Sequence, residues 1–347
     1  MAGTLSIFFV LPLDRACHST EALAHGLAAA GHRCVANVDG ARSFGSGGAP
    51  LFAIDERPDL AAFDLVVIDA TGLEHWDERQ MSLFHAALSV PTGNQVIVSD
   101  SDENNTTVYP DAVPAFLLHE SRDIALGGHR IPWACGLVQR TVERTAAAAP
   151  LANRERVILR SFRPAGHQSV RDALDLVLLP MLERRWPVDR RMHGTGIYAD
   201  AFYDRLLGAQ ACLAYCGTFM PRVIDNPFFA ERLGPHVLPG LKQPVAIARW
   251  DSLRFWESLA AGCLTIALDL DRYGFRVPVA PGNWEHYVGL DLGNLQNDLD
   301  RLAREEARWS EIAAAGRRWV LEHYAPQPAA ARFLATLRAL DRLKPAA

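Results

Sequence analysis

An alternation of apolar runs and amphipathic stretches runs along this chain, and it starts a second time at about residue 150. Residues 5–11 form a run that is apolar except at Ser6, and residues 19–30 follow with helical spacing and end at Gly31. A short, almost uninterrupted apolar run is typical of a parallel strand with helices on both faces. The pattern therefore predicts an α/β fold whose first strand is buried.

Two series of strands and helices are expected from this pattern. The first series holds strands at residues 65–68, 95–99, 115–118 and 130–133 and a helix at residues 77–88. The second series holds strands at residues 156–159, 211–215 and 263–269 and helices at residues 169–183, 252–261, 295–324 and after Pro326. Within the second series, residues 217–244 contain five prolines and are expected to form a long loop.

Length and a local change of composition divide the chain. At 347 residues it exceeds the roughly 250 residues at which a single hydrophobic core stops growing. Residues 141–153 are rich in alanine and charged residues, as in a connecting helix or linker. We expect a Rossmann-like domain at residues 1–150, a second Rossmann-like domain at residues 151–325, and a last helix at residues 326–347 that packs back on the first domain.

Net charge and cysteine usage limit which partners and which cellular compartment are expected. The formal net charge is -5 and the pI is about 6.2, so the whole chain has no attraction for a polyanion. Its six cysteines lie mostly in apolar runs and lack CxxC spacing, which favours reduced, buried thiols over a disulfide or zinc framework. The first apolar run is too short to span a bilayer. These features predict a cytoplasmic protein with no stable membrane insertion.

A loop, a capped helix and a buried strand are predicted in quick succession around Ser252. Asp251 or Ser252 is a suitable N-cap, and Gly262 is a suitable helix stop. The free amides at the helix start form an anion site, to which Arg254 adds a positive charge. Glu257 lies three residues later on the same face, where it can accept hydrogen bonds from ribose hydroxyls. From spacing alone, a surface ion pair between Arg254 and Glu257 is the alternative.

This segment resembles the donor-site helix of GT-B glycosyltransferases, among which the exostosin-like and spore-maturation-type (glycosyltransferase family 1-like) bacterial enzymes are the most similar. The residues that carry the resemblance are Ser252, Arg254, Phe255, Glu257, Leu259, Ala260, Ala261, Gly262 and Cys263. The resemblance implies two Rossmann-like domains facing a cleft, contacts from Ser252 and Arg254 to the donor diphosphate, and a contact from Glu257 to the ribose. Many retaining relatives have a further glutamate where this chain has Arg249, so the resemblance leaves the stereochemistry open.

A second stretch that is expected to face the donor follows the strand at residues 156–159. Its backbone amides, together with Arg160, Ser161 and Arg163, come at the carboxyl end of a strand, where α/β sheets place their ligands. A loop with solvated arginines is the alternative.

The loop after the first strand holds the candidates for a catalytic base. Asp14 and His18 follow the carboxyl end of that strand, and each accepts a proton near neutral pH when suitably placed. If the product is inverted, one of them is expected to take the acceptor's proton. The alternative is that Asp14 or Ser19 only caps the following helix and that His18 lies on the surface.

The acidic group Asp100, Asp102 and Glu103 raises the question of a metal. The string Asp100-Ser101-Asp102 matches the DxD motif of metal-dependent transferases, but the polar residues around it favour a turn. His119 and Glu120 lack the HExxH spacing of a zinc enzyme and are expected on the acceptor side. We therefore expect no metal and no cofactor, with a nucleotide-sugar as co-substrate.

The sequence thus predicts a metal-independent, hexosyltransferase-like GT-B enzyme that moves a sugar from a nucleotide-sugar to an acceptor. The acceptor stays open among a glycan, a protein, a natural product and a modified nucleic-acid base. Two other functions also stay open, which are a sugar-nucleotide epimerase and a catalytically silent sugar-nucleotide-binding partner protein.

Overall fold

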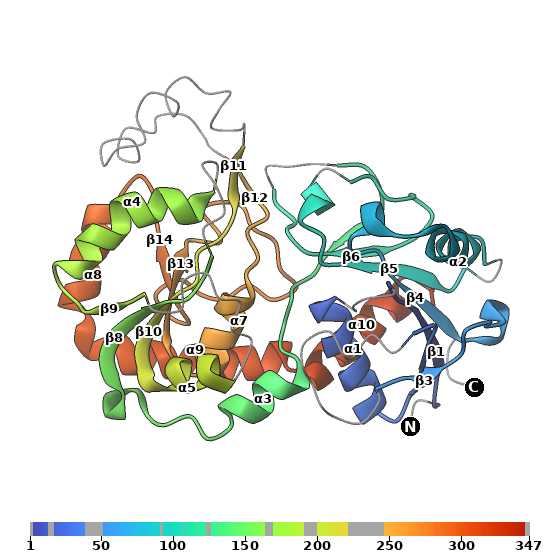
Figure 1. Cartoon of the computed structure of the whole chain (residues 1–347), viewed down its shortest axis with the longest axis horizontal. Helices are drawn as coiled ribbons and strands as arrows, with labels where there is room; N and C mark the ends of the chain where they lie inside the picture. The colour runs from blue at the N-terminus through green and yellow to red at the C-terminus, as the bar shows by residue number, and fades with distance from the viewer. Residues whose placement is uncertain are drawn as a thin grey trace. The chain divides into compact units, whose positions relative to one another are not determined.

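A computed structural model of the chain describes residues 3–12, 17–38, 51–90, 93–105, 107–122, 126–163, 169–190, 200–220 and 246–343. The chain folds into two compact units (Figure 1). Unit 1 contains Met1–Leu118, Leu126–Arg140 and Glu322–Ala347, and unit 2 contains His119–Ala125 and Thr141–Leu321. The chain therefore passes between the two units more than once.

Unit 1 is built on a seven-stranded sheet whose neighbouring strands are all parallel. Its order is β3-β2-β1-β4-β5-β6-β7. The strands are β1 (Ser6–Val10), β2 (Arg33–Ala36), β3 (Ala53–Ile54), β4 (Leu65–Asp69), β5 (Gln95–Ser99), β6 (Ala115–Leu117) and β7 (Arg130–Pro132). The strand order reverses between β1 and β4, and doubly wound sheets bind ligands outside the carboxyl ends of the strands at such a point.

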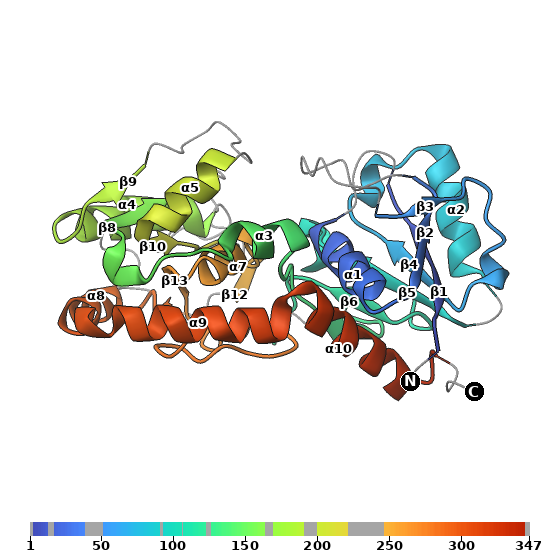
Figure 2. The same ribbon diagram turned by 90° about the horizontal axis from the view of Figure 1, so that it is seen from below.

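Three helices cover the two faces of this sheet, namely α1 (His18–Ala29), α2 (Glu78–Leu88) and α10 (Pro326–Ala339). Phe8 of β1 shares a buried cluster with Phe84 of α2, while Phe116 of β6 packs at 4.7 Å from Phe333 of α10. The helix α10 lies along α1 (Figure 2), and a Cβ on Gly26 would come within 1.9 Å of the Pro326 carbonyl oxygen. Glycine at that position permits the close approach of the two backbones.

Unit 2 is built on a five-stranded parallel sheet with the order β14-β13-β10-β8-β9. Its strands are β8 (Glu155–Arg160), β9 (Val188–Asp189), β10 (Ala209–Leu213), β13 (Leu264–Leu268) and β14 (Val288–Leu290). A separate antiparallel pair joins β11 (Thr218–Met220) and β12 (Ala246–Ala248). The order of the larger sheet reverses between β8 and β10, so the carboxyl ends of these strands are the position for a ligand in this unit.

Six helices belong wholly or partly to the described part of unit 2. They are α3 (Gln139–Thr145), α4 (Val170–Glu183), α5 (Asp200–Gly208), α7 (Leu253–Ala260), α8 (Leu295–Arg304) and α9 (Trp309–Tyr324). Short 3-10 helices add Leu60–Ala62, Leu73–His75, Asp102–Asn105, Leu151–Asn153 and Glu306–Arg308. The α3 and α9 helices each contain residues of both units.

The predicted α/β class is correct, and the longer elements lie within a few residues of their predicted places. The long loop predicted for residues 217–244 is wrong at its start, because Thr218–Met220 pairs with β12 as strand β11. Most of the rest of that stretch lies outside the described residues. The strand β2 was not predicted, since only Cys34, Val35 and Ala36 are apolar there and three residues show no period.

Candidate functional site

The start of α7 lies at the carboxyl ends of β8 and β10. Ser252 is its N-cap residue with extended backbone angles, but its hydroxyl makes no capping hydrogen bond. Asp251, the other predicted cap, accepts a hydrogen bond from the Trp256 indole at 2.6 Å instead. The Ser252 hydroxyl therefore caps none of the first amides of α7. The positive end of the helix dipole is left for an anion.

The end of α7 confirms the predicted stop at Gly262, whose φ of +68° is left-handed. The Gly262 amide donates to the carbonyl oxygen of Leu259 at 2.9 Å, and the Cys263 amide donates to that of Ser258 at 3.0 Å. These two bonds form a Schellman motif, for which glycine is the preferred residue. The motif turns the chain directly into β13 and so fixes the direction of α7 relative to the sheet.

Arg254 and Glu257 form an ion pair inside unit 2. Their side chains are only 15% and 9% exposed, so the alternative of a surface pair is wrong. The Arg254 Nε atom donates to the carbonyl oxygen of Ser161 at 2.9 Å, and the guanidinium carbon lies 3.8 Å from the centre of the Phe202 ring. The pair is thus held against the end of β8 by a backbone carbonyl and an aromatic face.

The three residues predicted after β8 have different surroundings. Arg160 is only 2% exposed and is ion-paired with Asp175, which also accepts a hydrogen bond from Tyr215 at 3.1 Å. The Arg160 Nη1 atom also donates to the carbonyl oxygen of Phe162 at 2.6 Å, so protein acceptors already surround this guanidinium. Ser161 is buried and is joined to Arg254 through its backbone, whereas Arg163 is exposed. The alternative of solvated arginines therefore fits Arg163 but not Arg160.

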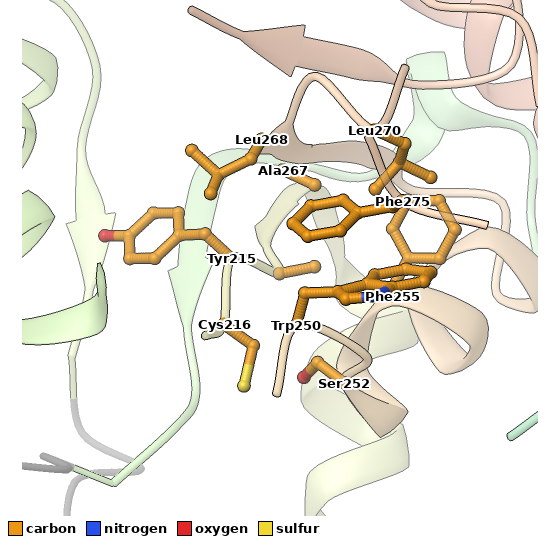
Figure 3. A pocket seen from close by; sticks show the side chains of 10 residues that line it. Tyr215, Cys216, Trp250, Ser252, Phe255, Ala267, Leu268, Leu270 and Phe275 are labelled. Carbon is orange, nitrogen blue, oxygen red and sulfur yellow. The ribbon is translucent and has the colours of Figure 1, made fainter. Parts of the chain in front are cut away.

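A small cavity of about 10 Å³ lies beside the N-cap of α7 (Figure 3). Trp250 and Phe275 stack at its wall with ring centres 4.3 Å apart and an interplanar angle of 17°. The Ser252 hydroxyl and the Cys216 thiol lie on the same side of the cavity, and Arg171 donates to that thiol at 3.0 Å. Polar groups thus accompany the aromatic wall at the start of the helix.

A segment that follows β6 in the sequence contributes to this site. His119 accepts a hydrogen bond from the Asp251 amide at 3.1 Å, and the Glu120 carbonyl oxygen accepts one from the Trp250 indole at 3.3 Å. His119 and Arg249 both have positive φ, of 67° and 54°, in a region that bulky residues rarely adopt. The expected place of His119 and Glu120 on the acceptor side stays untested, whereas their contacts lie in unit 2, beside α7.

The candidates for a catalytic base belong to unit 1. Asp14 lies outside the described residues, and His18 is the first residue of α1 and 8% exposed. The N-cap of α1 is Cys17, whose thiol accepts from the Thr20 amide, so the predicted capping by Ser19 is wrong. Instead, the Ser19 amide and hydroxyl both donate to Asp100.

Two aspartates at strand ends hold the start of α1. Asp69, the last residue of β4, accepts a hydrogen bond from the Cys17 amide at 2.7 Å, and burial raises its pKa. Asp100, which follows β5, accepts the hydrogen bonds of Ser19. Sequence reasoning gave Asp100 only a place in a polar turn, because a bond that joins residues 81 positions apart has no local signal.

Glu21 is a buried acid in the first turn of α1. Its Oε2 atom has no hydrogen-bond partner, and burial raises its pKa from 4.5 to about 7 although Arg140 opposes this. Lost hydration favours the neutral form of a buried carboxyl. Glu21 is therefore an acid of unit 1 whose protonation is expected to change near neutral pH.

In the described part of the chain, no three histidine, cysteine or acidic side chains gather as a metal site would require. No helix of that part is long and apolar enough to cross a membrane.

No protein-family model matches this sequence, and no curated protein matches it. Solved structures do match along almost its whole length. An α-glucosyltransferase in complex with UDP and a 13-mer DNA with a central A:G mismatch is 10% identical, with 96% of this chain and 100% of the other covered and a TM-score of 0.58. An α-glucosyltransferase in complex with UDP-glucose and DNA with an abasic site is 10% identical, with 97% and 100% covered and a TM-score of 0.56. HepE from Anabaena, in complex with UDP-glucose, is 10% identical over 96% and 100%, with a TM-score of 0.47. This chain therefore has the fold of the α-glucosyltransferases.

Proposed function

We propose that this chain is a GT-B glycosyltransferase that moves a sugar from a nucleotide-sugar bound by unit 2 to an acceptor bound by unit 1. The observation that carries the proposal is the start of α7. The hydroxyl of its N-cap residue Ser252 makes no capping bond, the helix begins where the strand order of unit 2 reverses, and Arg254 and Glu257 follow within its first turn and a half.

A uridine diphosphate sugar is the proposed donor, because the fold neighbours were solved with UDP and with UDP-glucose. Its diphosphate would meet the α7 amides, the Ser252 hydroxyl and the Arg254 guanidinium, and its ribose would meet Glu257. Positive charge at the helix start and on Arg254 would stabilise the departing nucleotide, so we propose that no metal is needed.

For the acceptor side, we propose that units 1 and 2 face a cleft and that closure excludes water from the donor. Asp14 or His18 then serves as the base if the product is inverted. Arg160, Ser161 and Arg163 stay proposed contacts of the sugar donor. Ser161 acts through its carbonyl oxygen, which accepts a hydrogen bond from the Arg254 side chain. None of the six cysteines forms a disulfide, which supports a reducing compartment such as the cytoplasm.

The charge of unit 1 favours an acceptor without phosphate groups. Unit 1 contains 17 Asp and Glu against 11 Lys and Arg, whereas unit 2 contains 23 against 24. Several arginines of unit 1 are also engaged within it, since Arg130 and Arg342 donate to backbone carbonyls and Arg79 pairs with Glu56. Proteins that bind DNA neutralise phosphates with such side chains. We therefore rank a glycan, protein or natural product above a nucleic-acid base as acceptor, although the fold neighbours were solved with DNA.

Calorimetric titration with UDP and UDP-glucose tests the donor site. We expect wild-type chain to bind both with and without EDTA, and the Arg254→Ala variant to bind neither. Arg156→Ala is the matched control, because Arg156 forms an exposed pair with Glu306 at the other end of β8. A failure of the wild-type chain to bind any nucleoside diphosphate or nucleotide-sugar would refute the proposal.

Turnover assays separate the proposed reaction from its alternatives. Release of UDP from UDP-glucose only when an acceptor is present indicates transfer. A change of the donor sugar without an acceptor indicates an epimerase, and binding without turnover across an acceptor panel indicates a silent partner protein. A panel that includes duplex DNA with a hydroxymethylated base also tests the ranking of acceptors, which transfer to that DNA would overturn.

A further inference from the structure

Glu257 has a second partner that the donor-site motif does not contain. The Tyr203 hydroxyl lies 3.2 Å from Glu257 Oε1, while Arg254 holds the other carboxylate oxygen. Tyr203 belongs to α5, which is 54 residues away in sequence from Glu257. Tyr203 and Glu257 are both buried, so neither hydrogen bond competes with bulk water.

Tyr203 is itself bound to the helix α3. Its hydroxyl lies 2.8 Å from the Thr141 Oγ1 atom, and Thr141 is completely buried. A phenol has one proton to donate, and the carboxylate of Glu257 can only accept. The Tyr203 proton therefore goes to Glu257, and Thr141 donates its proton to Tyr203. The chain of donors has one direction, from Thr141 through Tyr203 to Glu257.

Thr141 is the first residue of the second segment of unit 2, and it directly follows Arg140 of unit 1 in the same helix. Bonds within unit 2 fix this part of α3, because Thr145 donates to the Thr141 carbonyl oxygen at 2.7 Å and Arg317 donates to that of Thr145 at 2.8 Å. Glu257 is thus joined by two side-chain hydrogen bonds to the helix through which the chain passes from unit 1 to unit 2.

We propose that Tyr203 is the positioning residue of the donor-site carboxylate and that, through Thr141, it makes nucleotide affinity depend on the placement of α3. This rests on the proposed role of Glu257 at the donor ribose. Each oxygen of Glu257 has one protein donor, which leaves one lone pair on each for a ribose hydroxyl. Without the Tyr203 hydroxyl, Arg254 alone holds the carboxylate through Oε2, so Oε1 can turn about that contact and is no longer fixed toward the ribose.

The test compares two nucleotides on matched variants. Tyr203→Phe keeps the ring that packs at 5.3 Å from Phe202 and removes only the hydroxyl. We expect its affinity for UDP to fall about tenfold, as for one lost hydrogen bond to a charged group, and its affinity for 2′,3′-dideoxy-UDP to equal that of wild type. If the Tyr203 hydroxyl had only a structural role, the affinities for both nucleotides would fall equally.

Thr141→Val removes the hydroxyl that donates to Tyr203. We expect the affinity for UDP to fall about threefold and the affinity for the dideoxy nucleotide to stay unchanged. Thr145→Val is its control, because Thr145 is a buried threonine of the same helix whose hydroxyl bonds only to backbone oxygens. The Thr141 variant also provides the test if Tyr203→Phe does not fold.

The outcomes separate this proposal from the proposed function. Wild-type binding of UDP together with unchanged UDP affinity of Tyr203→Phe, or equal losses for both nucleotides, overturns the role of Tyr203 alone. Equal effects of Thr141→Val and Thr145→Val overturn the link to α3. A wild-type chain that binds no nucleoside diphosphate overturns the proposed function and this proposal together.

Discussion

Replacing Arg254 by methionine isolates the ion pair in α7, because methionine keeps most of the side-chain volume and removes the charge. The change leaves Glu257 with a 9% exposed side chain, a tyrosine donor and no counter-charge. Breaking a buried pair in this way costs about 3–5 kcal/mol. Loss of the contact with the Phe202 ring adds about 1 kcal/mol. We therefore expect Arg254→Met to lower the free energy of unfolding by about 5 kcal/mol and the midpoint of thermal unfolding by about 10 °C.

Calorimetry of the single and double variants checks the cause. In Arg254→Met/Glu257→Gln no charge is left buried, so we expect about half of the lost stability to return. Both variants are expected to lose UDP binding, which separates the site's role in binding from its role in folding. A loss below about 1 kcal/mol in the single variant, or a double variant no more stable than the single one, would refute the assignment of a buried, mutually dependent pair.

Three further changes test other parts of the structure. The pKa of Glu21 is about 7 in the folded chain and 4.5 in the unfolded chain, so the free energy of unfolding should fall as pH rises from about 4.5 to 7. In chemical denaturation, Glu21→Gln should be more stable than wild type by up to about 3 kcal/mol at pH 8 and equal to it at pH 4. Lower stability of the variant at pH 8 would contradict this. Gly316→Ala should lower the free energy of unfolding by about 2–3 kcal/mol, because its Cβ would lie 2.1 Å from the His286 carbonyl oxygen, and a thermal midpoint equal to that of wild type would contradict this. Ser252→Ala should leave the thermal midpoint unchanged, because the Ser252 hydroxyl makes no capping bond. In calorimetric titration, its dissociation constant for UDP should rise about threefold to tenfold, and unchanged UDP affinity would place the diphosphate elsewhere.

The elements that sequence analysis placed correctly have strong local signals. The strands β1 and β4 are apolar over at least four consecutive residues, and α2 has its aspartate cap and glutamine in a complete capping box. The strands β3 and β9 have two residues each and show no period, so only their pairing in the folded sheet reveals them. Their register depends on neighbouring strands that are far away in sequence.

The candidate site divides in the same way. The start and stop of α7 and the neighbouring positions of Arg254 and Glu257 follow from spacing within one helix. The pairing of Arg160 with Asp175 depends on how β8 and α4 pack, and the bond from His119 to Asp251 joins residues 132 positions apart. These contacts arise from the fold, and no periodicity or motif in the chain indicates them.

The motif that carries the family resemblance also has a structural reason to exist. Gly262 is required by its left-handed φ, and Leu259, Ala261 and Cys263 are completely buried at the junction between α7 and β13. Any chain that turns from a helix into a central parallel strand in this way needs small or apolar residues at those places. The match at these positions therefore reports the fold more than the ligand. The evidence for a nucleotide rests on Ser252, whose hydroxyl makes no capping bond, and on the neighbouring Glu257 carboxylate, which can still accept hydrogen bonds from a ribose. Comparing the affinities for UDP and its dideoxy analogue tests this directly, because a purely structural ion pair would not distinguish the two nucleotides.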